Sequence, residues 1–100
     1  MIYHARTAMI APGKAPEAME FGKKVVAYAK SKHGLTVTFM TQVGGPVGRV
    51  GWLTGYESLG AYEQAWAKLM ADPGWVKLLK AGPTLFAAGQ TQDAFWNVVS

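Results

Sequence analysis

Hydrophobic residues along the chain follow two periods, and each period predicts a different kind of element. Residues 2–9 alternate between apolar and polar, and residues 35–43, 49–56 and 91–99 are rich in β-branched and aromatic side chains. These four segments are therefore predicted strands. Between residues 15 and 32 the apolar positions recur at spacings of three and four, which predicts an amphipathic helix.

Two further helices are predicted from the residues that begin them. Ser58 is a good N-cap, and the apolar stripe after it is formed by Leu59, Tyr62, Trp66 and Leu69. Asp72 followed by Pro73 predicts a second helix start, because proline is preset for the first helical position. Pro83 ends or kinks this short helix, whose apolar edge is Trp75, Leu78 and Leu79.

The order of these elements predicts the fold class. The loop at residues 44–48, Gly-Gly-Pro-Val-Gly, is too short for a crossover, so the second and third strands form an antiparallel hairpin. The resulting order is β-α-β-β-α-β with an extra short helix before the last strand. This is the ferredoxin-like α+β arrangement, an antiparallel four-stranded sheet with helices on one face. With 100 residues, half of them apolar, we expect residues 1–100 to form one such domain.

Apolar side chains occupy both faces of the predicted strands, which predicts a partner for the open face of the sheet. The third strand carries Trp52, Thr54 and Tyr56 on one face and, on the other, Gly51, Leu53 and Gly55. The glycines suit the face that the helices approach, which places the two large aromatic side chains on the open face. Soluble monomers seldom expose patches larger than roughly several hundred Å². We therefore expect a homodimer through this face.

Composition excludes several classes of function. The chain has no cysteine, so a disulfide framework, a thiolate metal site and a cysteine nucleophile are excluded. The net charge is +4, but the only lysine cluster lies beside an apolar helical stripe, as on a solvated helix face, so nucleic-acid binding is not expected. No apolar run approaches the roughly 20 residues that cross a bilayer. The chain starts directly with strand-like residues rather than with a leader, so a cytoplasmic location without membrane contact is the expectation.

Metal and cofactor motifs are also missing. The only two histidines, His4 and His33, are distant in sequence, and the carboxylates are mostly on helix surfaces, so no metal site is expected. The Gly44-Gly45-Pro46 turn is not a phosphate loop, because no helix follows it. His33 is explained by its place beside Gly34 at the end of a helix, where a cation is favourable. We expect no cofactor.

Residues 43–75 carry a likeness to a known family. They hold a Gly-Gly-Pro turn, a strand ending in Tyr-Glu-Ser, a helix and an Asp-Pro-x-Trp step, and this order resembles the second half of NIPSNAP-type proteins. The start, Tyr-His-Ala-Arg-Thr at residues 3–7 and Pro-Gly-Lys at residues 12–14, is similar to the family's first strand and following loop. The resemblance implies the dimeric α/β-barrel superfamily, in which two ferredoxin-like units pair their sheets into a barrel that encloses a cavity.

The chain departs from the family pattern at two positions. His4 stands where the family usually has an acidic residue, and Thr54 stands where an aromatic residue is usual. The family has no agreed catalytic residues, so the resemblance assigns none here.

The candidate site lies on the predicted strands. His4 and Arg6 are two residues apart and share one face of the first strand, so they can meet Trp52, Thr54 and Tyr56 around a cavity. In this hypothesis Arg6 fixes an anionic or carbonyl group and His4 carries protons near neutral pH, with Tyr56 as a third catalytic candidate. The alternative is that His4 and Arg6 only pair with polar groups. Trp66 and Trp75 lie on apolar helical stripes and are expected in the core.

Two functions remain open at this point. The first is a non-enzymatic protein whose barrel cavity binds a small apolar or amphipathic molecule. The second is a cofactor-independent monooxygenase or isomerase acting on an activated phenolic or related small molecule. The residue types permit the enzyme and do not require it.

Overall fold

The computed structural model describes residues 1–100 as one four-stranded sheet and three helices. The strands are β1 (Ile2–Met9), β2 (Val37–Thr41), β3 (Arg49–Tyr56) and β4 (Gln92–Asn97). The helices are α1 (Ala15–His33), α2 (Leu59–Met70) and α3 (Pro73–Leu79). The sheet order is β2-β3-β1-β4 and every neighbouring pair is antiparallel, so the predicted ferredoxin-like fold is confirmed.

The local signals in the sequence set the helix ends. The Ser58 side chain accepts a hydrogen bond from the backbone N–H of Ala61 at 3.1 Å, which caps α2. The Asp72 side chain accepts one from the backbone N–H of Gly74 at 2.9 Å, which caps α3. Gly34 ends α1 with a φ of 65°, in the left-handed region that glycine adopts without strain.

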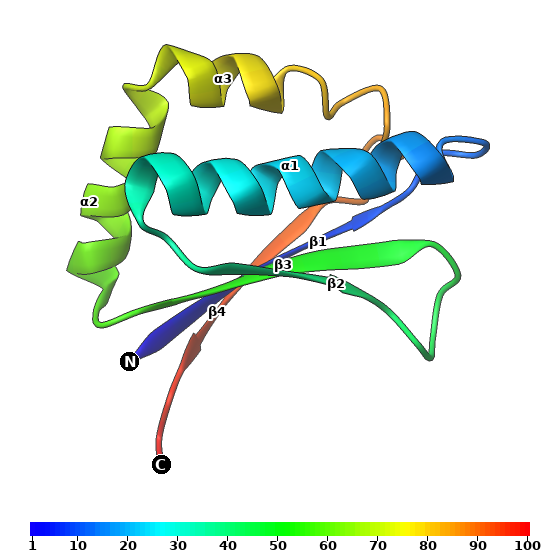
Figure 1. Ribbon diagram of the computed structural model, residues 1–100. Coiled ribbons are helices and arrows are strands. Elements are labelled where there is room, and N and C mark those ends of the chain that lie inside the picture. The colour runs from blue at the N-terminus through cyan, green and yellow to red at the C-terminus, as the bar shows by residue number, and fades with distance from the viewer.

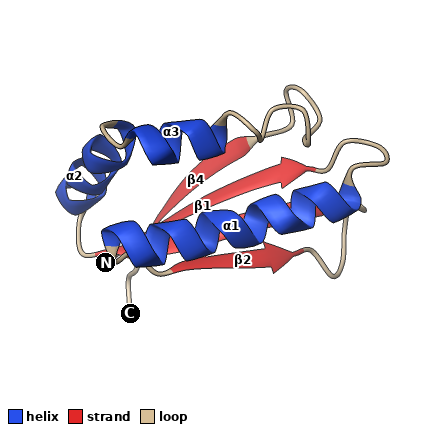
Figure 2. Cartoon of the chain, turned by 45° about the horizontal axis from the view of Figure 1, so that its top comes forward, coloured by secondary structure: helices blue, strands red, loops and turns tan.

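All three helices lie on the same face of the sheet, and the opposite face is bare (Figure 1). Helix α1 runs along the sheet, while α2 and α3 form a second row at the side of β4 (Figure 2). None of the three helices combines the length and the apolar character needed to cross a bilayer.

The predicted orientation of β3 is wrong. Trp52 lies directly opposite Arg6 in the sheet, and its ring meets the ring of Phe21 from α1 at 6.3 Å, edge to face. The Tyr56 ring likewise meets the ring of Tyr62 from α2 at 5.3 Å. These aromatic side chains, with Thr54 between them, therefore face the helices and not the open face. The physical reason is that large rings are needed to span the space between helix and sheet layers.

The open face carries the glycines and a different apolar surface. A methyl group at Gly55 would lie 2.7 Å from the Met1 side chain and 3.1 Å from the ring of Tyr3, so the absent side chain makes room for both. Trp96, opposite Tyr3 in the register, is 65% exposed, and Met40, opposite Gly51, is 39% exposed. The open face is apolar as predicted, although Trp52 and Tyr56, which were expected on it, lie on the opposite face.

The space between the layers is only partly filled. A small core cluster joins α1 to the other two helices, formed by Phe21, Val25, Ala29, Leu69 and Trp75. Only 12 of the 100 residues are buried, and no large side chain is completely enclosed. The fold therefore leaves a hollow between the sheet and the helices.

Candidate functional site

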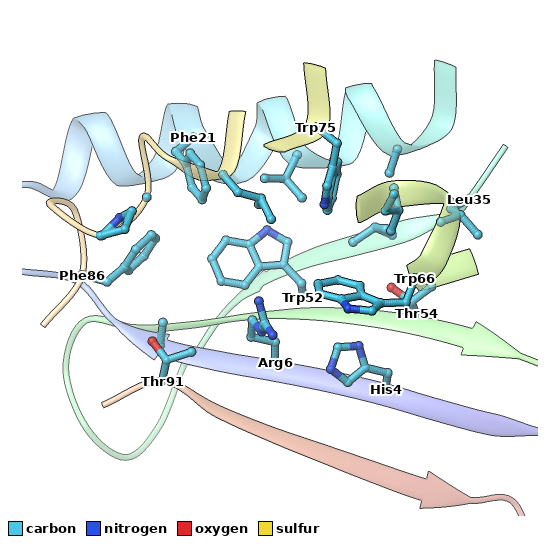
Figure 3. A pocket seen from close by; sticks show the side chains of 18 of the residues that line it. His4, Arg6, Phe21, Leu35, Trp52, Thr54, Trp66, Trp75, Phe86 and Thr91 are labelled. Carbon is cyan, nitrogen blue, oxygen red and sulfur yellow. The ribbon is translucent and has the colours of Figure 1, made fainter. Parts of the chain in front are cut away.

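This hollow is a cavity of about 450 Å³, lined by 22 residues of which 15 are hydrophobic. Pockets of roughly 300–1,000 Å³ with apolar walls and a few polar groups are typical of small-molecule sites. The structure brings together in this cavity all the residues that the sequence singled out as a site: His4, Arg6, Trp52, Thr54 and Tyr56. Figure 3 shows most of them pointing into it from β1 and β3.

The location of the cavity corrects the sequence-based expectation. We expected a cavity inside a barrel, between the sheets of two chains. The observed cavity instead lies between the sheet and the helices of one chain, with walls from α1, α2, α3 and the loop before β4. The reversed orientation of β3 accounts for this difference.

A polar network at one side of the cavity joins β1 to β4. The Arg6 guanidinium donates through Nε to Oδ1 of Asp93 at 2.8 Å and through Nη2 to Oδ2 at 3.1 Å. The Nε2 atom of His4 lies 2.8 Å from the same Oδ1. When Nε2 donates to this carboxylate, the other ring nitrogen, Nδ1, keeps a free lone pair and can accept a proton.

The charges in this network stabilise each other. The hydrogen bond from Arg6 holds the pKa of the Asp93 carboxyl below its usual value, although partial burial opposes the shift. The same contact raises the pKa of the Arg6 guanidinium. Both groups therefore stay ionised at neutral pH, and the positive charge of Arg6 is compensated within the chain.

Aromatic rings enclose the network. The His4 ring stacks on Phe95 at 4.8 Å and meets the edge of Tyr62 at 5.3 Å. The guanidinium carbon of Arg6 lies 5.8 Å from the centre of the Trp66 ring, within the range of a cation–π contact. These rings limit the orientations that the His4 and Arg6 side chains can adopt.

Two further polar groups line the cavity from β3. Thr54 is 6% exposed and is the one polar side chain among the buried residues. Burial raises the pKa of the Tyr56 phenol, so the phenol stays protonated and can donate a hydrogen bond at neutral pH. The site therefore holds a potential base at His4 and a neutral donor at Tyr56.

Asp93 and Tyr62 were not predicted as part of the site, although both contact His4. Asp93 was detectable as the single carboxylate within the last predicted strand. Tyr62 was placed on an apolar helical stripe, which gives no sign that its ring contacts His4. Trp75 lies in the core as predicted, and both Trp66 and Trp75 also form part of the cavity wall.

His33 belongs to a separate polar cluster that joins α1 to α3. Its Nε2 atom lies 2.8 Å from Oδ2 of Asp72, and the Tyr28 hydroxyl donates to the same oxygen at 2.7 Å. The cluster holds two helix ends together and lies outside the cavity. Nowhere does the chain bring together three or more histidine, aspartate or glutamate side chains that could hold a metal ion.

Several solved structures have the same fold as this chain. Atu4242 from Agrobacterium tumefaciens, a NIPSNAP family protein with unknown function, is 23% identical over 97% of this chain and 92% of its own, with a TM-score of 0.78. An uncharacterized NIPSNAP domain protein from Burkholderia xenovorans is 20% identical over 100% of this chain and 96% of its own, with a TM-score of 0.78. SnoaB from Streptomyces nogalater, a cofactor-independent oxygenase, is 12% identical over 99% of this chain and 93% of its own, with a TM-score of 0.72.

The fold and the cavity together define a ferredoxin-like α+β protein with a hollow between its layers. The NIPSNAP family model matches residues 3–96, and the chain therefore belongs to the NIPSNAP family. None of the curated proteins compared with the chain matches it at a significant level.

Proposed function

We propose that this NIPSNAP-family chain binds a small apolar or amphipathic molecule in the cavity between the sheet and the helices. The observation that carries the proposal is the cavity itself, about 450 Å³ with 15 hydrophobic residues among the 22 that line it. An empty apolar cavity forfeits the dispersion contacts of its walls, which a ligand restores.

The proposed assembly is a homodimer through the open face of the sheet. Tyr3, Leu53 and Trp96 lie on this face, which no helix of the chain covers (Figure 1). A second copy can cover it by a symmetric sheet-to-sheet contact. Because the cavity is on the opposite side of the sheet, each protomer of such a dimer keeps its own site.

Titration with Nile red, an uncharged dye that fluoresces in apolar surroundings, tests the binding proposal. Thr54→Phe places a ring in the cavity and should weaken dye binding at least tenfold. Trp96→Gln, on the open face, is the matched control and should leave the cavity affinity unchanged. Dye binding that Thr54→Phe does not weaken would contradict the proposal. Native mass spectrometry of the purified chain provides a second readout, since a retained ligand appears as added mass.

A cofactor-independent monooxygenase is the second candidate, and the pairing of His4 with Asp93 favours it. In this reaction the free Nδ1 atom of His4 removes a proton from an activated phenolic substrate such as an anthrone. The resulting carbanion reduces O₂; one oxygen atom becomes a carbonyl oxygen of the substrate and the other leaves as water. Arg6 and the Tyr56 hydroxyl stabilise the developing negative charge on the substrate oxygen.

Oxygen uptake with anthrone tests this second candidate. General-base catalysis typically contributes a factor of roughly 10²–10⁴, so His4→Ala should lower uptake by at least about a hundredfold. Arg6→Ala should lower it as well. Uptake that is absent in the wild type, or unchanged by both substitutions, would exclude this enzyme and leave the binding function standing.

A further inference from the structure

Two indole N–H groups in the cavity wall have no hydrogen-bond partner. They are Nε1 of Trp52 and Nε1 of Trp75, the only buried side-chain nitrogen or oxygen atoms of the chain without one. A buried donor left unpaired loses its hydration without compensation, so such groups call for an explanation when they occur. Both indoles line the same cavity, which suggests that an acceptor belonging to a ligand completes them.

The two N–H groups lie on opposite walls of the cavity, and both face the space between the helices and the sheet (Figure 3). Figure 3 shows the nitrogen of Trp75, on α3, at the end of the ring nearer the sheet. The nitrogen of Trp52, on β3, lies at the edge of its ring nearer the helices. Trp75 is only 5% exposed, and its ring belongs to the core cluster, so its N–H group is held in place by packing.

The cavity wall has no unpaired charged side chain that could bind a charged ligand. At neutral pH the only residues of its lining that can carry a charge are Arg6 and His4, because the Tyr56 phenol stays protonated. Arg6 already donates two hydrogen bonds to Asp93, and His4 lies against the same carboxylate. A ligand anion would have to compete with Asp93 for Arg6, and a ligand cation would find no unpaired carboxylate. An uncharged ligand avoids both costs.

We propose that Trp52 and Trp75 select an uncharged, mostly apolar ligand that carries carbonyl-type acceptors, each indole N–H donating to one acceptor. This inference rests on the proposed binding function and specifies the class of ligand. A hydrocarbon of the same size fills the cavity but leaves both N–H groups unpaired. A carboxylate supplies acceptors but brings a negative charge into an apolar site.

Equilibrium dialysis of three probes of similar size tests the inference: 1,4-naphthoquinone, naphthalene and 1-naphthoate. One hydrogen bond contributes about a fivefold change in affinity, so the wild type should bind the quinone at least fivefold more tightly than naphthalene and more tightly than 1-naphthoate. Trp52→Phe and Trp75→Phe keep an aromatic ring and remove the N–H, and each should reduce the quinone-to-naphthalene ratio about fivefold. Trp96→Phe, which removes an indole outside the cavity, should leave the ratio unchanged.

Naphthalene binding reports the integrity of the cavity in each variant, so a misfolded variant is recognised by loss of naphthalene. Equal wild-type affinities for quinone and naphthalene would overturn the inference while leaving the proposed binding function intact. Preferential binding of 1-naphthoate would also overturn it, and so would a ratio that neither cavity substitution changes. Failure of all three probes to bind the wild type would instead overturn the proposed function, and the inference with it.

Discussion

Arg6 on β1 and Asp93 on β4 lie directly opposite each other in the sheet and are joined by two hydrogen bonds of 2.8 and 3.1 Å. Every residue of β4 is exposed, so this strand has little core packing of its own. The Arg6–Asp93 pair therefore links the edge strand to β1 at the place where the cavity begins. By holding the Asp93 carboxylate in place, Arg6 also positions the oxygen atom that lies 2.8 Å from Nε2 of His4.

A double-mutant cycle with Arg6→Gln and Asp93→Asn should give a modest coupling energy. The side chains are 35% and 40% exposed, so solvent screens the pair, and we expect about 0.5–1 kcal/mol at pH 7. The pKa of Asp93 is lowered on folding, so this contribution is present above its unfolded pKa of about 3.9 and is lost as the pH falls below that value. Urea unfolding of the wild type, the two single variants and the double variant, at pH 7 and at pH 2.5, measures the coupling energy and its dependence on pH. A coupling that persists unchanged at the lower pH would contradict the ionic origin.

The strands could be predicted well because their boundaries depend on local signals. The strands at residues 2–9 and 49–56 were located residue for residue, and the caps Ser58 and Asp72 mark the observed helix starts. The two faces of β3 were exchanged, because a period of two separates the faces without saying which one the helices cover. Glycine on one face is compatible with a close helix and equally with neighbouring side chains that lie close to it, here at Gly55 those of Met1 and Tyr3.

The site could be predicted only in part, for a related reason. His4 and Arg6 share a face whatever the fold, so their pairing in one site follows from their spacing. Asp93 meets them across 87 and 89 residues of sequence, through a strand order and register that only tertiary packing determines. The cavity arises because the side chains between the layers do not fill the space, and residue types alone do not give that volume.

The cluster at Asp72 should make stability depend on pH in the acid range. Hydrogen bonds from Tyr28 and His33 lower the pKa of the Asp72 carboxyl to about 2, against an unfolded value of about 3.9. The stabilisation is present above about pH 4 and is lost as the pH falls toward 2. Asp72→Asn should therefore flatten the fall in the free energy of unfolding between pH 4 and 2, measured by urea titration. Glu63→Gln, at an exposed carboxylate on α2 that forms no ion pair, is the control and should keep the wild-type slope.

Trp96→Glu should convert the proposed dimer into a monomer. Trp96 is 65% exposed in the single chain, so its replacement costs the monomer little stability, while a buried, unpaired carboxylate would strongly disfavour a sheet-to-sheet contact. Light scattering at micromolar concentration measures the mass. Gln64→Glu adds the same charge on the exposed surface of α2 and should remain dimeric. A wild-type protein that is monomeric in this assay would refute the proposed assembly.

Gly22→Ala should destabilise the chain although alanine favours helices. Gly22 is buried on α1, and a methyl group there would overlap the ring of Phe39, which is stacked on Trp52 at 5.2 Å and cannot retreat toward it. Helix propensity favours alanine by about 1 kcal/mol, whereas overpacking costs about 1–3 kcal/mol, so we expect a net loss of up to about 2 kcal/mol in urea unfolding. Gly60→Ala on α2, where a methyl group meets only ordinary contacts, should be neutral or stabilising. Phe39→Leu should restore part of the loss in the Gly22→Ala background, because it removes the overlapping ring atoms. A Gly22→Ala variant as stable as Gly60→Ala would contradict the close packing of α1 against the sheet.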